Sequence, residues 1–148
     1  MKMHEGLPVI TLREPWATFV IRGWKTVEVR PFQRLRSLEG RTIGIHAGER
    51  WDSNYLLKAD PYMDDYQRGV MADIRKRRVQ GILGIALVRA VGHVGPAESR
   101  AAMMSISWSS EVRWGLVLDD VFEYSAPILC AGHQGIWYYE GAEGGDAE

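Results

Sequence analysis

Three charged residues of complementary chemistry stand close together early in the chain, at Lys25, Glu28 and Arg30. A desolvated lysine can lose its proton near neutral pH and act as a base or nucleophile, while a nearby carboxylate moves protons during an acyl transfer. Alternatively, Lys25 and Arg30 hold phosphates, and Glu28 accepts a hydrogen bond from the exocyclic amine of a base. A third interpretation is an ion-pair network that only fixes the local turn.

Tryptophan side chains near these charges could provide surfaces on which nucleic-acid bases stack. Trp24 follows the helix-ending Gly23 and precedes Lys25, and an exposed aromatic next to cations is typical of surfaces that bind single-stranded nucleic acid. Trp16 is more often a core residue than a stacking platform, because a tryptophan buries so much area. Trp108 and Trp114 either add stacking surface or pin a loop.

Two further polar residues are candidates for the same site. His46 can carry a proton or contact a phosphate because it titrates near neutrality, although a buried structural histidine fits equally well. Arg13 lies just before a predicted helix whose first N–H groups lack partners within the helix and favour an anion. We therefore expect Arg13 and the start of this helix to bind an anion together.

Local patterns predict how these residues are positioned. Residues 7–12 have strand character, Pro15 suits the first position of a helix, and Gly23 marks its end. Residues 25–30 alternate, so the valines enter the core and Glu28 shares the open face with Arg30, while Lys25 belongs to the preceding turn. Residues 41–47 form a strand that turns His46 toward a cleft or the surface.

The rest of the chain continues this mixture of short strands and helices. The patterns predict helices over 51–78 with a break at Asp60-Pro61, one or two helical turns over 96–104, and strands over 81–94, 116–124 and 134–139. The segment before residue 116 is expected to be a mobile loop. We expect an α+β fold, a small β-barrel with a few peripheral helices, in one domain over residues 1–140, with a disordered acidic tail over 141–148.

The near-neutral total charge hides two basic zones. The formal net charge is −1, yet residues 22–50 carry seven Lys/Arg against three Glu, a balance of +4. Residues 68–78 carry five Lys/Arg against one Asp, again +4. Each zone is either a solvated face or a site for a polyanion. The run Arg75 to Arg78 also suits the negative end of a helix.

Composition excludes several classes of protein. The 148 residues contain a single cysteine, Cys130, which excludes an internal disulfide and fits a reducing compartment. The N-terminus has no apolar run resembling a signal peptide and no stretch is long enough to span a bilayer, so we expect a cytoplasmic protein without a membrane partner. No complete set of metal ligands and no phosphate-binding glycine loop are present, so we expect no metal and no cofactor.

The early motifs also resemble a known family. The sequence is similar to the ASCH (activating signal cointegrator homology) domain of the PUA-like superfamily. The resemblance rests on Pro15-Trp16-Ala17, on the pattern Gly-x-Lys-x-x-Glu-x-Arg at Gly23 to Arg30, on Ile45-His46-Ala47 and on a closing segment that ends near residue 140. It implies a PUA-like β-barrel with a cleft between the first helix and the barrel, where the Gly-x-Lys-x-x-Glu-x-Arg segment lies.

Family members are held to bind RNA or to act in RNA-linked processes. Some bacterial relatives are amidohydrolases that remove the acetyl group of N4-acetylcytidine with a lysine, a threonine and a glutamate, which points here to Lys25, Thr26 and Glu28. In those relatives a threonine stands three positions after the lysine, where this chain has Glu28. Other relatives are described as nucleases.

We therefore expect a domain that binds RNA or a modified nucleotide in a basic cleft after the first helix. The expected site consists of Arg13, Trp16, Trp24, Lys25, Thr26, Glu28, Arg30 and His46. Hydrolysis of an acylated cytidine or of RNA is the alternative, and a protein-interaction module is the third. The sequence leaves the oligomeric state open.

Overall fold

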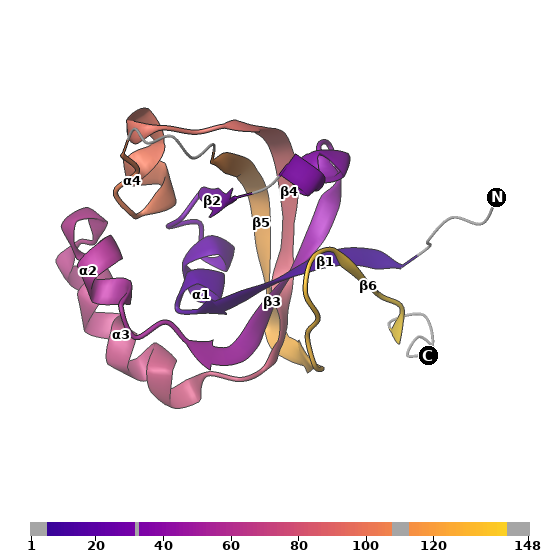
Figure 1. The fold of residues 1–148 in the computed structure, drawn as a ribbon. Coiled ribbons are helices and arrows are strands. Elements are labelled where there is room, and N and C mark those ends of the chain that lie inside the picture. The colour runs from indigo at the N-terminus through magenta and orange to yellow at the C-terminus, as the bar shows by residue number, and fades with distance from the viewer. Residues whose placement is uncertain (1–5, 32, 108–112, 142–148) are drawn as a thin grey trace.

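A mixed sheet of six strands organises the fold, with helices on one side of it (Figure 1). The computed structural model describes residues 6–31, 33–107 and 113–141. The strands are β1 (Leu7–Glu14), β2 (Val27–Arg30), β3 (Thr42–Trp51), β4 (Gly81–His93), β5 (Trp114–Leu129) and β6 (Trp137–Tyr139). Their order across the sheet is β2-β5-β4-β3-β1-β6. This confirms the predicted α+β class.

The sheet curves around α1 (Trp16–Ile21), as Figure 1 shows. β1 and β3 are parallel, and the other neighbouring pairs are antiparallel. Within the described residues, β2 and β6 form two separate edges that do not pair with each other. The predicted closed barrel is therefore not confirmed.

Short helices connect the strands. They are α2 (Tyr55–Ala59), α3 (Asp65–Arg77) and α4 (Ser99–Ala102), with 3-10 turns at Gln33–Leu38, Asp60–Tyr62 and Pro96–Glu98. α3 begins at a capping box, in which the Asp64 carboxylate accepts from the Gln67 N–H and the Gln67 side chain accepts from the Asp64 N–H. The predicted break at Asp60-Pro61 is confirmed.

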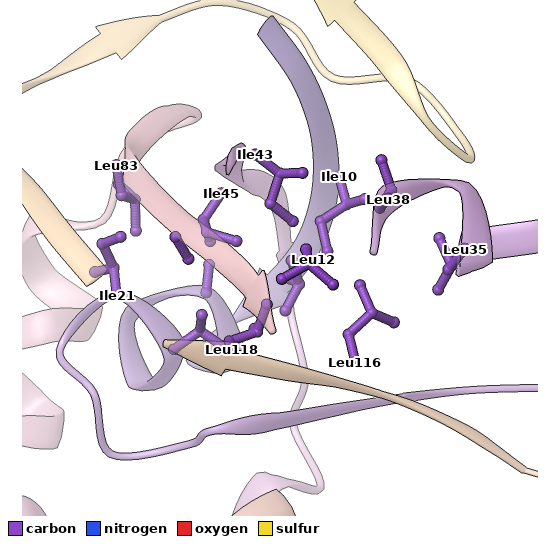
Figure 2. Close-up of a cluster of buried hydrophobic side chains, with 14 of the residues drawn as sticks. Ile10, Leu12, Ile21, Leu35, Leu38, Ile43, Ile45, Leu83, Leu116 and Leu118 are labelled. Carbon is purple, nitrogen blue, oxygen red and sulfur yellow. The ribbon is translucent and has the colours of Figure 1, made fainter. Parts of the chain in front are cut away.

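Aliphatic side chains from the strands and α1 form the main core (Figure 2). Ile43 and Ile45 of β3 belong to this cluster together with Ile21 and Leu118, and all four are fully or nearly fully buried. A second cluster lies between α1 and the helices outside the sheet, where Phe19 packs among methionines. α1 is thus buried on most of its surface, and it packs against β1, β3, β4 and β5.

Several element predictions are confirmed and others need revision. The strand expected over 81–94 is the central strand β4, and Lys25 does lie outside β2. The closing strand is shorter than expected, because Gly135 has a φ of +70° and only Trp137 to Tyr139 pair with β1. Trp108, the predicted mobile loop around it and the predicted disordered tail beyond Gly141 lie outside the described residues.

β5 is much longer than the strand that covers its outer edge. β2 pairs with it only over Trp114–Val117, and the remainder has no strand partner on that side within the described residues. Asp120 has a left-handed φ of +47°, and Pro127 lies near the end of the strand. Among the described helices, none is both long and apolar enough to cross a membrane.

Candidate functional site

Lys25 is the most deeply buried charged residue of the predicted site, with only 2% of it exposed. Its Nζ donates to the Ala102 carbonyl at 2.5 Å, lies 3.8 Å from Glu28 Oε1, and sits 4.9 Å from the centre of the Trp16 ring. Burial lowers the pKa of Lys25, and Glu28 partly opposes this effect. The ammonium is therefore held by one carbonyl, one carboxylate and one aromatic face.

Glu28 joins Lys25 to Arg30. Arg30 Nε donates to Glu28 Oε2 at 2.9 Å, and Arg30 Nη2 donates to the Thr11 carbonyl on β1 at 3.1 Å. The Arg30 side chain thus spans from β2 to β1, two strands that are not neighbours in the sheet. The three charges predicted to converge do so, with Glu28 between two cations.

Trp16 forms a wall beside this network, and its orientation is fixed by a residue that the sequence analysis missed. Trp16 Nε1 donates to Asp52 Oδ2 at 2.8 Å, and the same carboxylate accepts from Lys58 and from the Asn54 N–H. Burial acts to raise the pKa of Asp52, but these hydrogen bonds outweigh it and hold the pKa below its usual value. Asp52 directly follows β3, and no local pattern marked it.

A hollow of about 330 Å³ opens in front of this network. It is lined by Thr11, Leu12, Arg13, Trp16, Glu28, Val29 and Arg30. Lys25 is not among the lining residues, because it lies behind Glu28 and Trp16. The hollow combines one aromatic side chain, one carboxylate and two guanidinium groups.

A second hollow of about 680 Å³ continues the first across β1. The two share Thr11, Leu12, Arg13 and Arg30. The larger one adds Arg34, residues 48–50 after the buried part of β3, Gln80, and residues 132–135 of the loop before β6. We call the two hollows together the basic groove.

The charge of the basic groove is strongly positive. Its larger part is lined by four arginines, at positions 13, 30, 34 and 50, against the single carboxylate of Glu49, a balance of +3 with His133 neutral. Arg13 and Arg50 are exposed. The predicted basic zone over 22–50 therefore supplies part of the lining of this hollow. Residues 132–135, which the sequence analysis did not predict, supply its opposite side.

His46 faces neither a cleft nor the surface, contrary to the prediction from strand parity, and it is instead the buried structural histidine that we gave as the alternative. It is fully buried, its Nε2 donates to the Cys130 carbonyl at 2.8 Å, and its ring meets Trp137 edge to face. Burial lowers the pKa of His46, which favours the neutral ring. The loop at Gly132 approaches so closely that a Cβ there would lie 2.6 Å from the His46 ring. The alternation of side chains along a strand could not predict this contact, because the loop that covers His46 begins 84 residues further along the chain.

The anion expected at the start of α1 is replaced by a side chain of the protein itself. The Glu14 carboxylate accepts from the Thr18 N–H at 2.9 Å and from the Thr18 hydroxyl at 2.7 Å. Burial raises the pKa of Glu14 although the bonds from Thr18 oppose this effect. Arg13 instead lines both hollows of the basic groove.

Three other predicted residues lie away from the groove lining. Trp24 is half-buried and packs against Phe19 and Tyr66 rather than beside the hollow. Thr26 uses its backbone to hold the turn, since its N–H donates to Ala101 and its carbonyl accepts from Leu118. Trp114 is half-buried against His93. Trp24 and Thr26 therefore position the segment rather than line the hollow.

No group of three or more His, Cys, Asp or Glu side chains suited to a metal ion occurs in the described part of the chain. Cys130 and His133 are spaced as C-x-x-H in the sequence, and no third such side chain joins them within the described residues. Burial raises the pKa of the Cys130 thiol, which disfavours the thiolate that metals require.

Solved structures identify the architecture around this groove. A crystal structure of ASCH from Zymomonas mobilis matches with a TM-score of 0.62 at 18% identity, covering 95% of this chain and 92% of that chain. The protein has the ASCH fold. Two crystal structures of single-substitution variants of the Zymomonas protein match with TM-scores of 0.58 and 0.57, at 18% and 19% identity. They cover 95% and 94% of this chain and 94% and 92% of theirs.

The ASCH fold is the one that the early motifs predicted. No protein-family model matches the sequence, and no curated protein matches it. Within the ASCH fold, the Gly-x-Lys-x-x-Glu-x-Arg segment builds the deep end of the basic groove with Trp16. What the groove binds is not set by the fold.

Proposed function

We propose that the protein binds RNA or a modified nucleotide in the basic groove. The observation that carries this proposal is the continuity of the two hollows, one lined by Trp16 and Glu28 and the other by four arginines. A base with an exocyclic amine fits the first, where Glu28 accepts a hydrogen bond and Trp16 offers an aromatic surface. Phosphates fit the second, because guanidinium groups bind them in bidentate geometry.

The network behind the first hollow supports recognition by holding its walls rigid. Asp52 fixes the Trp16 indole, and Lys25 holds Glu28 from behind while Arg30 holds it from the side. Arg30 also donates to the Thr11 carbonyl of β1, so its guanidinium group is held at both ends of the network. Preorganised side chains lose less entropy on binding than mobile ones.

Replacement of exposed groove arginines tests this proposal. Arg13→Gln combined with Arg50→Gln removes two phosphate contacts, which should reduce the salt slope of RNA binding by about 1.4 and weaken binding about tenfold at roughly physiological salt. The measurement is fluorescence anisotropy of a labelled oligouridylate over a salt series.

Arg89→Gln is the matched control, since Arg89 is also exposed but pairs with Asp119 and lines neither hollow. Wild-type affinity for the groove variant, or an equal loss in the control, would overturn the proposal. A mainly apolar protein partner would show little salt dependence, which separates the interaction-module alternative.

Hydrolysis of an acylated cytidine or of RNA is the second candidate. Burial lowers the pKa of Lys25, and Glu28 lies 3.8 Å from its Nζ, a combination suited to proton transfer. Against this, Lys25 lies behind the wall of the hollow, so substrate would reach Glu28 first. Incubation of the wild type and Lys25→Ala with N4-acetylcytidine and with single-stranded RNA tests turnover, because product that depends on Lys25 forms only in an enzyme.

A cytoplasmic location, expected from the single Cys130, remains a prediction.

A further inference from the structure

A second basic surface lies next to the groove, at the C-terminal end of α3. Arg75, Lys76, Arg77 and Arg78 follow one another there, and all are exposed. A helix end is stabilised by cations in its last turn, but that effect is small and falls off within one turn. Arg77 pairs with Asp73 at 2.6 Å, whereas the other three have no carboxylate within ion-pair distance in the described parts of the chain.

Trp51 holds this surface against the end of β3. The guanidinium groups of Arg75 and Arg78 lie 5.2 and 5.8 Å from the centre of its ring. Trp51 ends β3 and directly follows Arg50, which lines the groove. Cation–π contact therefore holds Arg75 of α3 and the following Arg78 close to the strand that carries a groove arginine.

The chain that leaves α3 connects the two surfaces directly. It runs along the lower end of the sheet into β4 in Figure 1. Arg78 and Val79 line a further hollow of about 220 Å³, and the next residue, Gln80, lines the basic groove. The 220 Å³ hollow also contains Arg22 and Arg77.

The balance of charge in this hollow stays positive. Three arginines, Arg22, Arg77 and Arg78, line it together with the carboxyls of Glu14 and Glu123, a balance of +1. Glu123 lies 3.7 Å from Arg22, and Glu14 is buried against Thr18. Arg22 and Glu123 thus offset each other, and Arg77 and Arg78 are the exposed guanidinium groups that remain in the lining.

We propose that the ligand of the basic groove is a single-stranded RNA whose backbone continues over Gln80 to Arg77 and Arg78, rather than a free nucleoside. This inference rests on the proposed function of the groove. The groove alone serves a base and its adjoining phosphates, and the end of α3 adds phosphate contacts for a longer strand. Protein partners with acidic segments would use the same charges, and the experiment distinguishes them.

The dependence of affinity on the length of the RNA tests whether the strand reaches Arg77 and Arg78. Binding of labelled oligouridylates of about 4 and about 16 nucleotides is compared for the wild type and for the double variant Arg77→Gln, Arg78→Gln. The longer probe should bind the variant about tenfold more weakly at roughly physiological salt, with the salt slope reduced by about 1.4, and the shorter probe should bind equally to both. The charge-conserving variant Arg77→Lys, Arg78→Lys should keep affinity within about threefold, since phosphate contacts need a cation.

Arg68→Gln is the control on the same helix, because Arg68 is an ion-paired arginine like Arg77 but lines none of the three hollows. Unfolding transitions of all variants verify that they are folded. Wild-type affinity of the variant for both probes, or an equal loss for both, overturns the extension while the groove proposal stands. Failure of the wild type to bind either probe overturns both, and leaves the acidic protein partner as the explanation of the charge.

Discussion

Glu28→Gln is expected to destabilise the protein strongly, although glutamate and glutamine have nearly the same volume. The change removes the carboxylate that lies 3.8 Å from Lys25 Nζ and accepts from Arg30 Nε at 2.9 Å. Lys25 is 2% exposed, so its charge cannot be solvated instead. Removing one partner of a buried ion pair leaves an uncompensated charge, and we expect a loss of about 3 kcal/mol in the free energy of unfolding.

Lys25→Met should be much milder, which makes the pair of variants informative. Methionine fills a similar volume, and Glu28 keeps its ion pair with Arg30. The cost is the hydrogen bond to the Ala102 carbonyl, about 1 to 3 kcal/mol for an acceptor left buried, and removal of the desolvated ammonium offsets part of it. We expect a net loss of about 1 kcal/mol.

The pH dependence of the unfolding free energy tests the burial of Lys25 independently. Burial places the pKa of Lys25 below its ordinary value of 10.5, so between the folded and the ordinary value the unfolded chain binds more protons. The contribution of Lys25 to stability therefore increases as pH rises through this window. Glu28→Gln removes the group that opposes the lowering of the pKa and should extend the window to lower pH, whereas Lys25→Met should abolish it.

Urea unfolding followed by tryptophan fluorescence at several pH values measures these effects. The reasoning fails if Lys25→Met is as destabilising as Glu28→Gln, or if the Lys25-dependent rise with pH persists in the methionine variant. Either result would mean that the ammonium is better solvated than its contacts indicate.

Three other substitutions test separate contacts. Asp52→Ala frees the Trp16 indole and should cost about 1 to 3 kcal/mol in unfolding free energy while altering tryptophan emission. Glu14→Gln should remove a fall in stability as pH rises from 4.5 toward the higher folded pKa, a slope that acid-range urea titrations would detect in the wild type alone. Gly132→Ala places a methyl group against His46 and should lower the thermal midpoint and weaken RNA binding; an unchanged protein would show that the loop moves freely.

Local patterns predicted the elements near the site well. Proline at position 15, glycine at 23 and the alternation through Arg30 are local signals, and they located the first helix, the turn with Lys25 and β2. The convergence of Lys25, Glu28 and Arg30 followed from spacing of two and three residues. Such contacts depend on short stretches of backbone whose geometry a sequence pattern indicates.

Long-range contacts were beyond local reasoning. The open face predicted for His46 is covered by the loop at Gly132 and by Trp137, and a strand pattern says nothing about which distant segment packs on it. No local pattern marked Glu14, which ends β1 and whose carboxylate accepts from the N–H and the hydroxyl of Thr18 in α1. The larger hollow was also missed, because it combines β1, β3 and the loop before β6, which meet only in the folded sheet.

The outer edge of β5 limits how the protein associates with copies of itself. A long strand with unpaired N–H and C=O groups is a template on which foreign strands can add. Here the left-handed Asp120 interrupts the regular backbone, and Pro127 removes one donor from the same strand. A sheet can extend only along a continuous ladder, so this margin resists fibril growth and domain exchange without requiring a covering helix.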